Sequence, residues 1–243
     1  MTEANIALSA LIALVAFMYS SVGHAGASGY FAVLSLAGWA PAEIRPLALV
    51  LNVLVASVAS FKYMRAGHFR ARLFWPFALL SVPAAALGGY LELPAVFFSR
   101  LIGIVLLLSA LWMLARRQDA AQTKAPTLST GITTGALLGF IAGLTGTGGG
   151  IFLSPLMLLC RWASIREVSA VAAPFILLNS LAGLGGLSLK GVALPQGSLI
   201  LIASAVVSGT LGAQLGSRVF GQNTIRALLS VVLLIAGAKL LLR

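Results

Sequence analysis

Two glycine-rich interruptions hold the residues of this sequence that are best suited to binding a small molecule. The first is Gly23-His24-Ala25-Gly26-Ala27-Ser28-Gly29, and the second is Gly146-Thr147-Gly148-Gly149-Gly150. Glycine in a helix interior costs about 1 kcal/mol relative to alanine, so such clusters should unwind a helix locally. Unwinding frees backbone amides, and the amides at the start of the next helix carry partial positive charge. Both interruptions therefore favour an anion as ligand.

Polar side chains accompany the interruptions. His24 could donate to an anion or carry a coupling proton because it titrates near neutral pH, or it could be a neutral histidine held by a nearby carbonyl. Asn52 and Asn179 could hydrogen-bond a ligand or join helices. From the residues alone, the candidate binding set is His24, Gly26, Ser28, Gly29, Asn52, Thr145, Gly146, Thr147, Gly148, Gly149, Gly150 and Asn179.

Close helix packing is the alternative explanation for the glycines, and it would suffice for a single cluster. Two clusters at equivalent positions, each followed by a short apolar piece, favour a binding site instead. Non-helical backbone at membrane depth must be buried by protein or line a wet cavity. With Cys160 as the single cysteine, we expect no intrachain disulfide and no multi-cysteine metal cluster. We also expect no catalytic residue, metal site or cofactor.

The elements that carry these residues must lie in a membrane. Of the 243 residues, 60% are hydrophobic and 9% charged, and the mean hydropathy is +1.04. Long apolar runs without a barrel strand's alternation predict membrane helices, which need roughly 20 residues to cross. The predicted spans are Ile6–Val22, Pro46–Tyr63, Leu73–Tyr90, Val96–Ala115, Gly131–Thr145, Val168–Leu187, Gly197–Leu215 and Ile225–Leu242. Tyr30–Trp39 and Ile151–Leu159 are too short to cross alone and should be re-entrant or halves of broken helices.

The two halves of the chain resemble each other. Ser28-Gly29-Tyr30-Phe31 with Ile44-Arg45 aligns with Gly149-Gly150-Ile151-Phe152 with Ile165-Arg166 at a constant offset of 121 residues. We predict an all-α polytopic membrane protein with a first repeat at 1–115, a cytoplasmic linker at 116–127 and a second repeat at 128–243. Each repeat has four crossing helices and one glycine-broken short piece, about eight crossings in all. The alternative is ten crossings, as inverted five-helix repeats.

The net charge of +11 fits the same interpretation. Lys and Arg lie between apolar spans, where the positive-inside rule accounts for them, so we expect the lipid bilayer rather than nucleic acid as partner. The loop from Arg65 to Arg72 and the linker should be cytoplasmic. The first apolar run has no basic region before it, so we expect it to remain in the mature protein rather than to be a removed signal peptide.

The segment Gly146-Thr147-Gly148-Gly149-Gly150-Ile151-Phe152-Leu153-Ser154-Pro155 resembles the G-x-G-G-G-x-x-x-x-P signature of the TauE/SafE sulfite-exporter family, also called sulfonate uptake permeases. The resemblance covers nearly the whole chain. It implies secondary transport of sulfite, sulfonates or related small anions across the bacterial inner membrane, and it adds Pro155 to the candidate binding set. The first half departs from the pattern, because it lacks the glycine triplet and has Leu34 in the place of Pro155.

We therefore predict a multi-pass inner-membrane transporter that binds a small anion between the two glycine breaks. One alternative is an intramembrane serine hydrolase, because Gly26-Ala27-Ser28-Gly29 matches a G-x-S-G pattern. A serine nucleophile needs a base within hydrogen-bond reach, and the second half contains no histidine. The other alternative is a passive anion channel.

Overall fold

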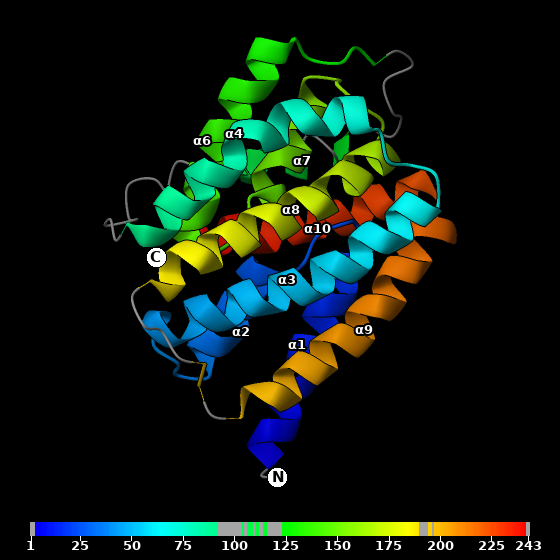
Figure 1. The fold of residues 1–243 in the computed structure, drawn as a ribbon. Coiled ribbons are helices and arrows are strands. Elements are labelled where there is room, and N and C mark those ends of the chain that lie inside the picture. The colour runs from blue at the N-terminus through cyan, green and yellow to red at the C-terminus, as the bar shows by residue number, and fades with distance from the viewer. Residues whose placement is uncertain are drawn as a thin grey trace.

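A computed structural model of the chain describes residues 3–91, 104, 106–108, 110–111, 114–115, 123–189, 194–195 and 197–241. Every regular element in these ranges is a helix (Figure 1), which confirms the all-α prediction. The helices are α1 (Glu3–Ser20), α2 (Ala27–Leu36), α3 (Pro41–Arg65), α4 (Ala71–Tyr90), α6 (Leu128–Thr145), α7 (Gly150–Leu159), α8 (Ile165–Ser188), α9 (Ser198–Arg218) and α10 (Gln222–Leu241). The predicted span Val96–Ala115 lies mostly outside the described residues.

Among the described residues, five helices are long and apolar enough to cross a membrane: α3, α4, α6, α8 and α9. Three shorter apolar helical segments accompany them, Ile6–Ser20, Ala27–Leu36 and Gly150–Leu159. Large apolar side chains such as Leu128, Leu137 and Leu199 remain exposed on the outer surface, as contact with lipid requires. The chain is thus a polytopic membrane protein.

Helices α3 and α8 begin earlier than the apolar runs suggest, because an acidic residue caps each first turn. The Glu43 carboxylate accepts a hydrogen bond from the Ala40 amide at 2.9 Å, and Glu167 accepts one from the Ser164 amide at 2.9 Å. A carboxylate at a helix start satisfies a free amide and complements the helix dipole. Glu43 and Glu167, which precede the apolar runs in the sequence, therefore belong to the first turns of α3 and α8.

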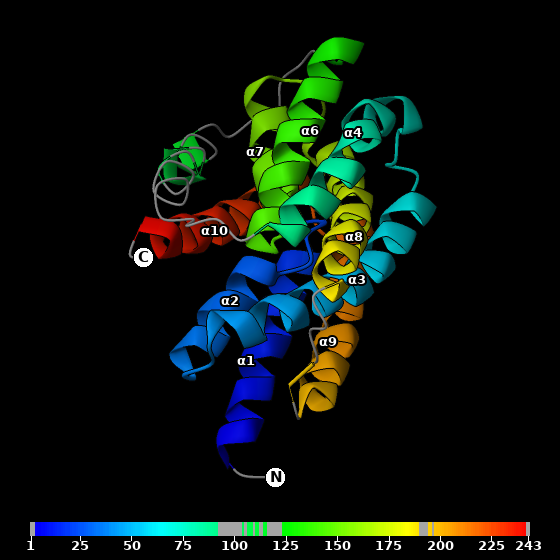
Figure 2. The same ribbon diagram turned by 60° about the vertical axis from the view of Figure 1, so that its left-hand side comes forward.

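The short helices return toward the side from which the chain came. In Figures 1 and 2, α2 runs back along α1 and α7 runs back along α6, so each glycine break is the tip of a helical hairpin. The α1/α2 hairpin comes from the lower part of the view and the α6/α7 hairpin from the upper part. Their tips meet near the middle of the molecule.

Each hairpin packs mainly against a helix from the other half of the chain. Helix α1 lies along α9, α6 lies along α4, and α3 and α8 pack together between them. The contacts depend on glycine, since a methyl group on Gly139 of α6 would strike the Ser81 carbonyl, and one on Gly216 of α9 would strike the Ser21 carbonyl. The two halves make equivalent contacts. If α1, α3 and α4 of the first half are matched with α6, α8 and α9 of the second, the α1–α9 contact corresponds to the α6–α4 contact, and the α3–α8 contact corresponds to itself. The repeat and linker boundaries stay a prediction.

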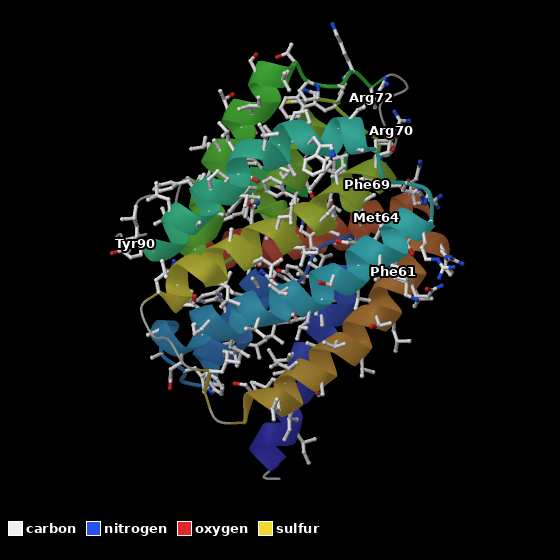
Figure 3. The ribbon with its side chains drawn as sticks, in the orientation of Figure 1. Phe61, Met64, Phe69, Arg70, Arg72 and Tyr90 are labelled. Atoms are coloured by element: carbon white, nitrogen blue, oxygen red, sulfur yellow. The ribbon has the colours of Figure 1, made fainter. Side chains whose placement is uncertain are left out.

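Corresponding helices of the two halves run in opposite directions. Figure 1 shows α3 and α8 antiparallel, with the α3–α4 turn and the start of α9 at opposite ends of the molecule. The opposite directions match the inverted repeats of the alternative, although the short helices α2 and α7 return instead of crossing as that alternative expected. Figure 3 shows Arg70 and Arg72 beside the α3–α4 turn, and Tyr90 at the far end of α4. Arg70 forms an ion pair with Glu167, which brings the start of α8 to the same end.

Candidate functional site

Both breaks are built from glycines with left-handed backbone, which other residues adopt only with strain. Gly23 has φ +76° and Gly26 has φ +102°, and Gly26 is the residue immediately before α2. In the second break, Gly146 ends α6 with φ +71°, and Gly149 precedes α7 with φ +80°. The glycine clusters therefore end one helix and start the next in both hairpins.

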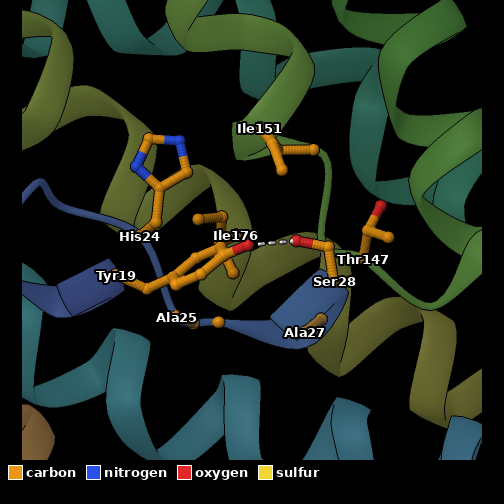
Figure 4. Close-up of a pocket in the computed structure, with 9 residues that line it drawn as sticks. Tyr19, His24, Ala25, Ala27, Ser28, Thr147, Ile151 and Ile176 are labelled. Carbon is orange, nitrogen blue, oxygen red and sulfur yellow. Dashed lines mark hydrogen bonds between the residues drawn. The ribbon is translucent and has the colours of Figure 1, made fainter. Parts of the chain in front are cut away.

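A small cavity lies between the two hairpin tips (Figure 4). It is lined by Tyr19, His24, Ala25, Gly26, Ala27, Ser28, Thr147, Ile151 and Ile176. The first break and the start of α2 supply most of the lining, the second break supplies Thr147, and α8 contributes Ile176. The volume of about 10 Å³ is room for about one water molecule.

Three hydrogen bonds fix the polar side chains of the first hairpin. The Tyr19 and Ser28 hydroxyls lie 2.8 Å apart, as Figure 4 shows. His24 is almost fully buried, with Nδ1 3.1 Å from the Val22 carbonyl and Nε2 3.2 Å from Ser154 Oγ. A neutral ring with its proton on Nδ1 donates to the carbonyl and accepts from the serine hydroxyl. The His24–Ser154 bond joins the first hairpin to α7 of the second.

Polar groups also surround the second break. The Thr145 hydroxyl donates to the Ile141 carbonyl at 2.7 Å, and its oxygen lies 2.8 Å from Thr147 Oγ1. A methyl group on Gly148 would lie 3.1 Å from Asn52 Nδ2 and 2.8 Å from Ser180 Oγ, so the backbone of this break touches α3 and α8 directly. Asn52 Nδ2 donates to Ser180 Oγ at 3.3 Å.

The structure thus gathers part of the predicted binding set. Four of its members line the cavity: His24, Gly26, Ser28 and Thr147. Asn52, Thr145 and Gly148 form the polar surroundings of the second break. Because Ser28 and Thr147 come from breaks more than a hundred residues apart in the sequence, the fold itself creates the site.

The other predicted residues lie outside the lining: Gly29, Gly146, Gly149, Gly150, Pro155 and Asn179. Gly29 packs against Val15 of α1, while Gly149 and Gly150 let α7 approach α8 closely. Asn179 is buried in α8, and neither polar atom of its amide has a hydrogen-bond partner among the residues that the structure describes. For these residues, as for the four that line the cavity, a role in substrate binding stays a prediction.

Arg45 of α3 is a residue whose role sequence reasoning missed. Its Nη2 atom donates to the carbonyls of Gly143 at 2.8 Å, Gly89 at 3.1 Å and Gly88 at 3.2 Å. These carbonyls lie in the last turns of α6 and α4, where the helix dipole favours a cation. A methyl group on Gly146 would lie 3.1 Å from Arg45 Cγ, so this arginine also borders the second break.

The repeat contained the signal for this role. Arg166, which aligns with Arg45, donates from Nη2 to the Phe220 carbonyl at 3.1 Å, just beyond the end of α9. Tyr19, Ser154 and Ile176 were also missed, because a tyrosine, a serine and an isoleucine in apolar helices are ordinary until their neighbours are known. Within the described part of the chain, no three His, Cys, Asp or Glu side chains are grouped closely enough to hold a metal ion.

Comparison with known proteins gives consistent results. The profile of the family described as sulfite exporter TauE/SafE matches residues 8–240. The probable membrane transporter protein y4hK of Sinorhizobium fredii is 38% identical over 245 residues, which cover 99% of this chain and 99% of that protein. The probable membrane transporter protein MJ0441 of Methanocaldococcus jannaschii is 24% identical over 205 residues, covering 78% of this chain and 76% of that protein. No solved structure matches the chain.

Proposed function

Because this membrane transporter belongs to the sulfite exporter TauE/SafE family, we propose that it carries small anions by secondary transport. The proposed substrates are sulfite, sulfonates or related organosulfur compounds. The main support is that the two glycine breaks, which come from opposite halves of the chain, border one cavity. The proposed location is the bacterial inner membrane, since the relative that matches over its full length comes from a bacterium.

The chemistry of the cavity suits an anion. Helices α2 and α7 both begin beside it, and their first amides carry partial positive charge. The hydroxyls of Tyr19, Ser28 and Thr147 provide further donors, and none of the lining residues is acidic. The sulfur oxyanion would accept hydrogen bonds from both hairpins at once.

The small volume of the cavity favours a carrier over a passive channel. Sulfite is larger than the single water molecule that about 10 Å³ can hold. The hairpin tips must therefore separate before an anion binds and close again around it. Closure of this kind isolates the site from both sides of the membrane, which alternating access requires.

Intramembrane hydrolysis has less support. The Ser28 hydroxyl is paired with Tyr19, while the nearby base His24 makes its contact with Ser154. His24 is instead our candidate for a coupled proton. A second proton on the ring would turn Nε2 into a donor and place a positive charge beside the bound anion.

Flux measurements on the purified protein in liposomes test the proposal. We expect sulfite or a short sulfonate to accumulate when a pH gradient is imposed. Equilibration without accumulation would indicate a channel, and a protein that moves neither sulfite, a sulfonate nor lactate would contradict the proposal.

A pair of glycine variants tests the site. Gly148 and Gly197 have similar backbone angles, φ +74° and +81°, so alanine should cause similar backbone strain at both. At Gly197 the added methyl group meets no atom of the described residues within 4 Å, whereas at Gly148 it lies 2.6 Å from Ile176. We expect Gly148→Ala to reduce sulfite flux about tenfold or more, and Gly197→Ala to preserve it. Equal flux in the two variants would show that the second break is only a packing feature.

A further inference from the structure

A lysine from the last turn of α10 reaches the first glycine break. Lys239 Nζ donates a hydrogen bond to the Ser28 carbonyl at 2.9 Å, and it lies 5.1 Å from the centroid of the Phe31 ring. Ser28 is the residue whose hydroxyl lines the cavity. The ammonium group of Lys239 therefore contacts the backbone of a residue that lines the proposed substrate site.

The same phenylalanine borders the second break. A methyl group on Gly146 would lie 3.7 Å from Phe31 Cε2 and 3.1 Å from Arg45 Cγ. Phe31 is 8% exposed, so its ring lies almost fully buried between Lys239 and Gly146. One cation thus stands at each break, Lys239 at the first and Arg45 at the second, with an aromatic ring between them.

Snorkelling toward the lipid headgroups is the ordinary role for a lysine near the end of a membrane helix. Lys239 does not fit this role, because its ammonium group contacts the backbone and an aromatic ring of α2 in the first hairpin. An ionisable group directed into a helix bundle is more often part of a substrate path.

We propose that Lys239 and Phe31 form the entrance through which the anion reaches the cavity, with Lys239 as the positioning residue that attracts it. The inference rests on the proposed transport of small anions. Movement of the Phe31 ring exposes the ammonium group, and the anion replaces the ring as its neighbour before passing Ser28. Figures 1 and 2 show the end of α10 far from the α3–α4 turn, so this entrance faces the opposite side of the membrane from that turn.

A cysteine variant can separate the charge of Lys239 from its shape. In a Cys160→Ser background, Lys239→Cys is reconstituted in liposomes and then treated with methanethiosulfonate reagents. The aminoethyl reagent rebuilds a side chain close to lysine, the methyl reagent adds a neutral group, and the sulfonatoethyl reagent adds a negative charge. Because the same folded protein is measured before and after treatment, a folding defect does not confuse the result.

We expect Lys239→Cys to raise the KM for sulfite about tenfold or more and to flatten the dependence of kcat/KM on salt. The aminoethyl reagent should restore the KM and the salt dependence of kcat/KM, and the methyl reagent should restore neither of these quantities. The sulfonatoethyl reagent should raise the KM further. Lys239→Arg should keep most of the activity. A methyl adduct as active as the aminoethyl adduct would overturn the inference, because the side chain would then act only by filling space.

The chain offers a matched control for the loss of one charge. Arg65 lies 5.4 Å from the ring centroid of Phe61, a similar cation–aromatic contact on an exposed part of α3. Arg65→Cys with the same reagents should leave the KM and its salt dependence unchanged. If the parent protein carries sulfite and the Lys239 variants behave like those of Arg65, the inference that Lys239 and Phe31 form the entrance is contradicted, while the proposed function stands. If the parent carries no anion, both fail.

Discussion

At the scale of single residues, the most informative contact is the hydrogen bond between His24 and Ser154, because it connects the two hairpin tips. The sequence drew attention to His24 as an ionisable group inside an apolar region. Ser154 gave no comparable signal, since its importance depends on which helix faces the first break. Arg45 was visible through its repeat partner Arg166, yet its role became clear only once the ends of α4 and α6 were seen to meet beside it.

A double-mutant cycle measures this connection. His24→Ala and Ser154→Ala should each lower the free energy of unfolding in detergent, and the double variant should lose less than the sum of the two. We expect a coupling energy of about 0.6 kcal/mol, which is typical of hydrogen bonds between membrane helices. Additive losses would mean that the two hairpins are held together by packing alone.

Asn179 should behave differently from Asn52. Neither polar atom of the Asn179 amide has a partner, so Asn179→Leu should leave the free energy of unfolding unchanged or raise it by about 1 kcal/mol or more. Asn52→Leu removes the hydrogen bond to Ser180 and should therefore lower the free energy of unfolding. Thermal unfolding and sulfite flux are measured on the same samples. Stable Asn179→Leu protein with reduced flux would support substrate binding by the amide, and a clear loss of stability would show that it holds helices together.

At the scale of helices, much of the fold follows from composition and glycine placement. Long apolar runs predicted the membrane helices, and the clusters at 23–29 and 146–150 predicted where two of them break. The direction of the chain after each break was not predictable, because hydropathy is the same for a segment that continues and one that returns. The packing of α1 against α9 and of α6 against α4 depends on close backbone contacts at glycines. The sequence does not show which helix faces each glycine, so these packing partners could not be predicted from it.

Replacement of a packing glycine tests the contact between α6 and α4. Gly139→Ala puts a methyl group against the Ser81 carbonyl and must push the helices apart, which should lower the free energy of unfolding by about 1–3 kcal/mol. Gly185 of α8 is also helical, but among the described residues no atom lies within 4 Å of an added methyl group there. Gly185→Ala should therefore be neutral or stabilising by up to about 1 kcal/mol. Similar thermal unfolding of both variants would contradict close glycine packing.

At the scale of the whole molecule, three of the described basic residues, Arg70, Lys124 and Arg161, lie in segments that contact one another at one end. Arg70 pairs with Glu167 at the start of α8, and the linker residue Lys124 donates its amide to the Arg161 carbonyl at 3.0 Å. The α3–α4 turn, the α7–α8 turn and the described end of the linker at Lys124 therefore share one side. The positive-inside rule predicts that this side is cytoplasmic. Charge counting in the sequence could not choose between parallel and inverted repeats. The opposite directions of α3 and α8 favour the inverted arrangement.

Cysteine accessibility from each side of the membrane tests this topology. Gly67 in the α3–α4 turn and Gly197 before α9 are both exposed and have φ +78° and +81°, and in the part of the chain that the structure describes no atom lies within 4 Å of an added Cβ at either position. In a Cys160→Ser background, a membrane-impermeant thiol reagent should label Gly67→Cys only from the cytoplasm and Gly197→Cys only from outside. Parallel repeats would place both on the same side. The exposed Cys160 of the parent chain, at the α7–α8 turn, should label together with Gly67→Cys, because the Arg70–Glu167 pair holds these turns at one end.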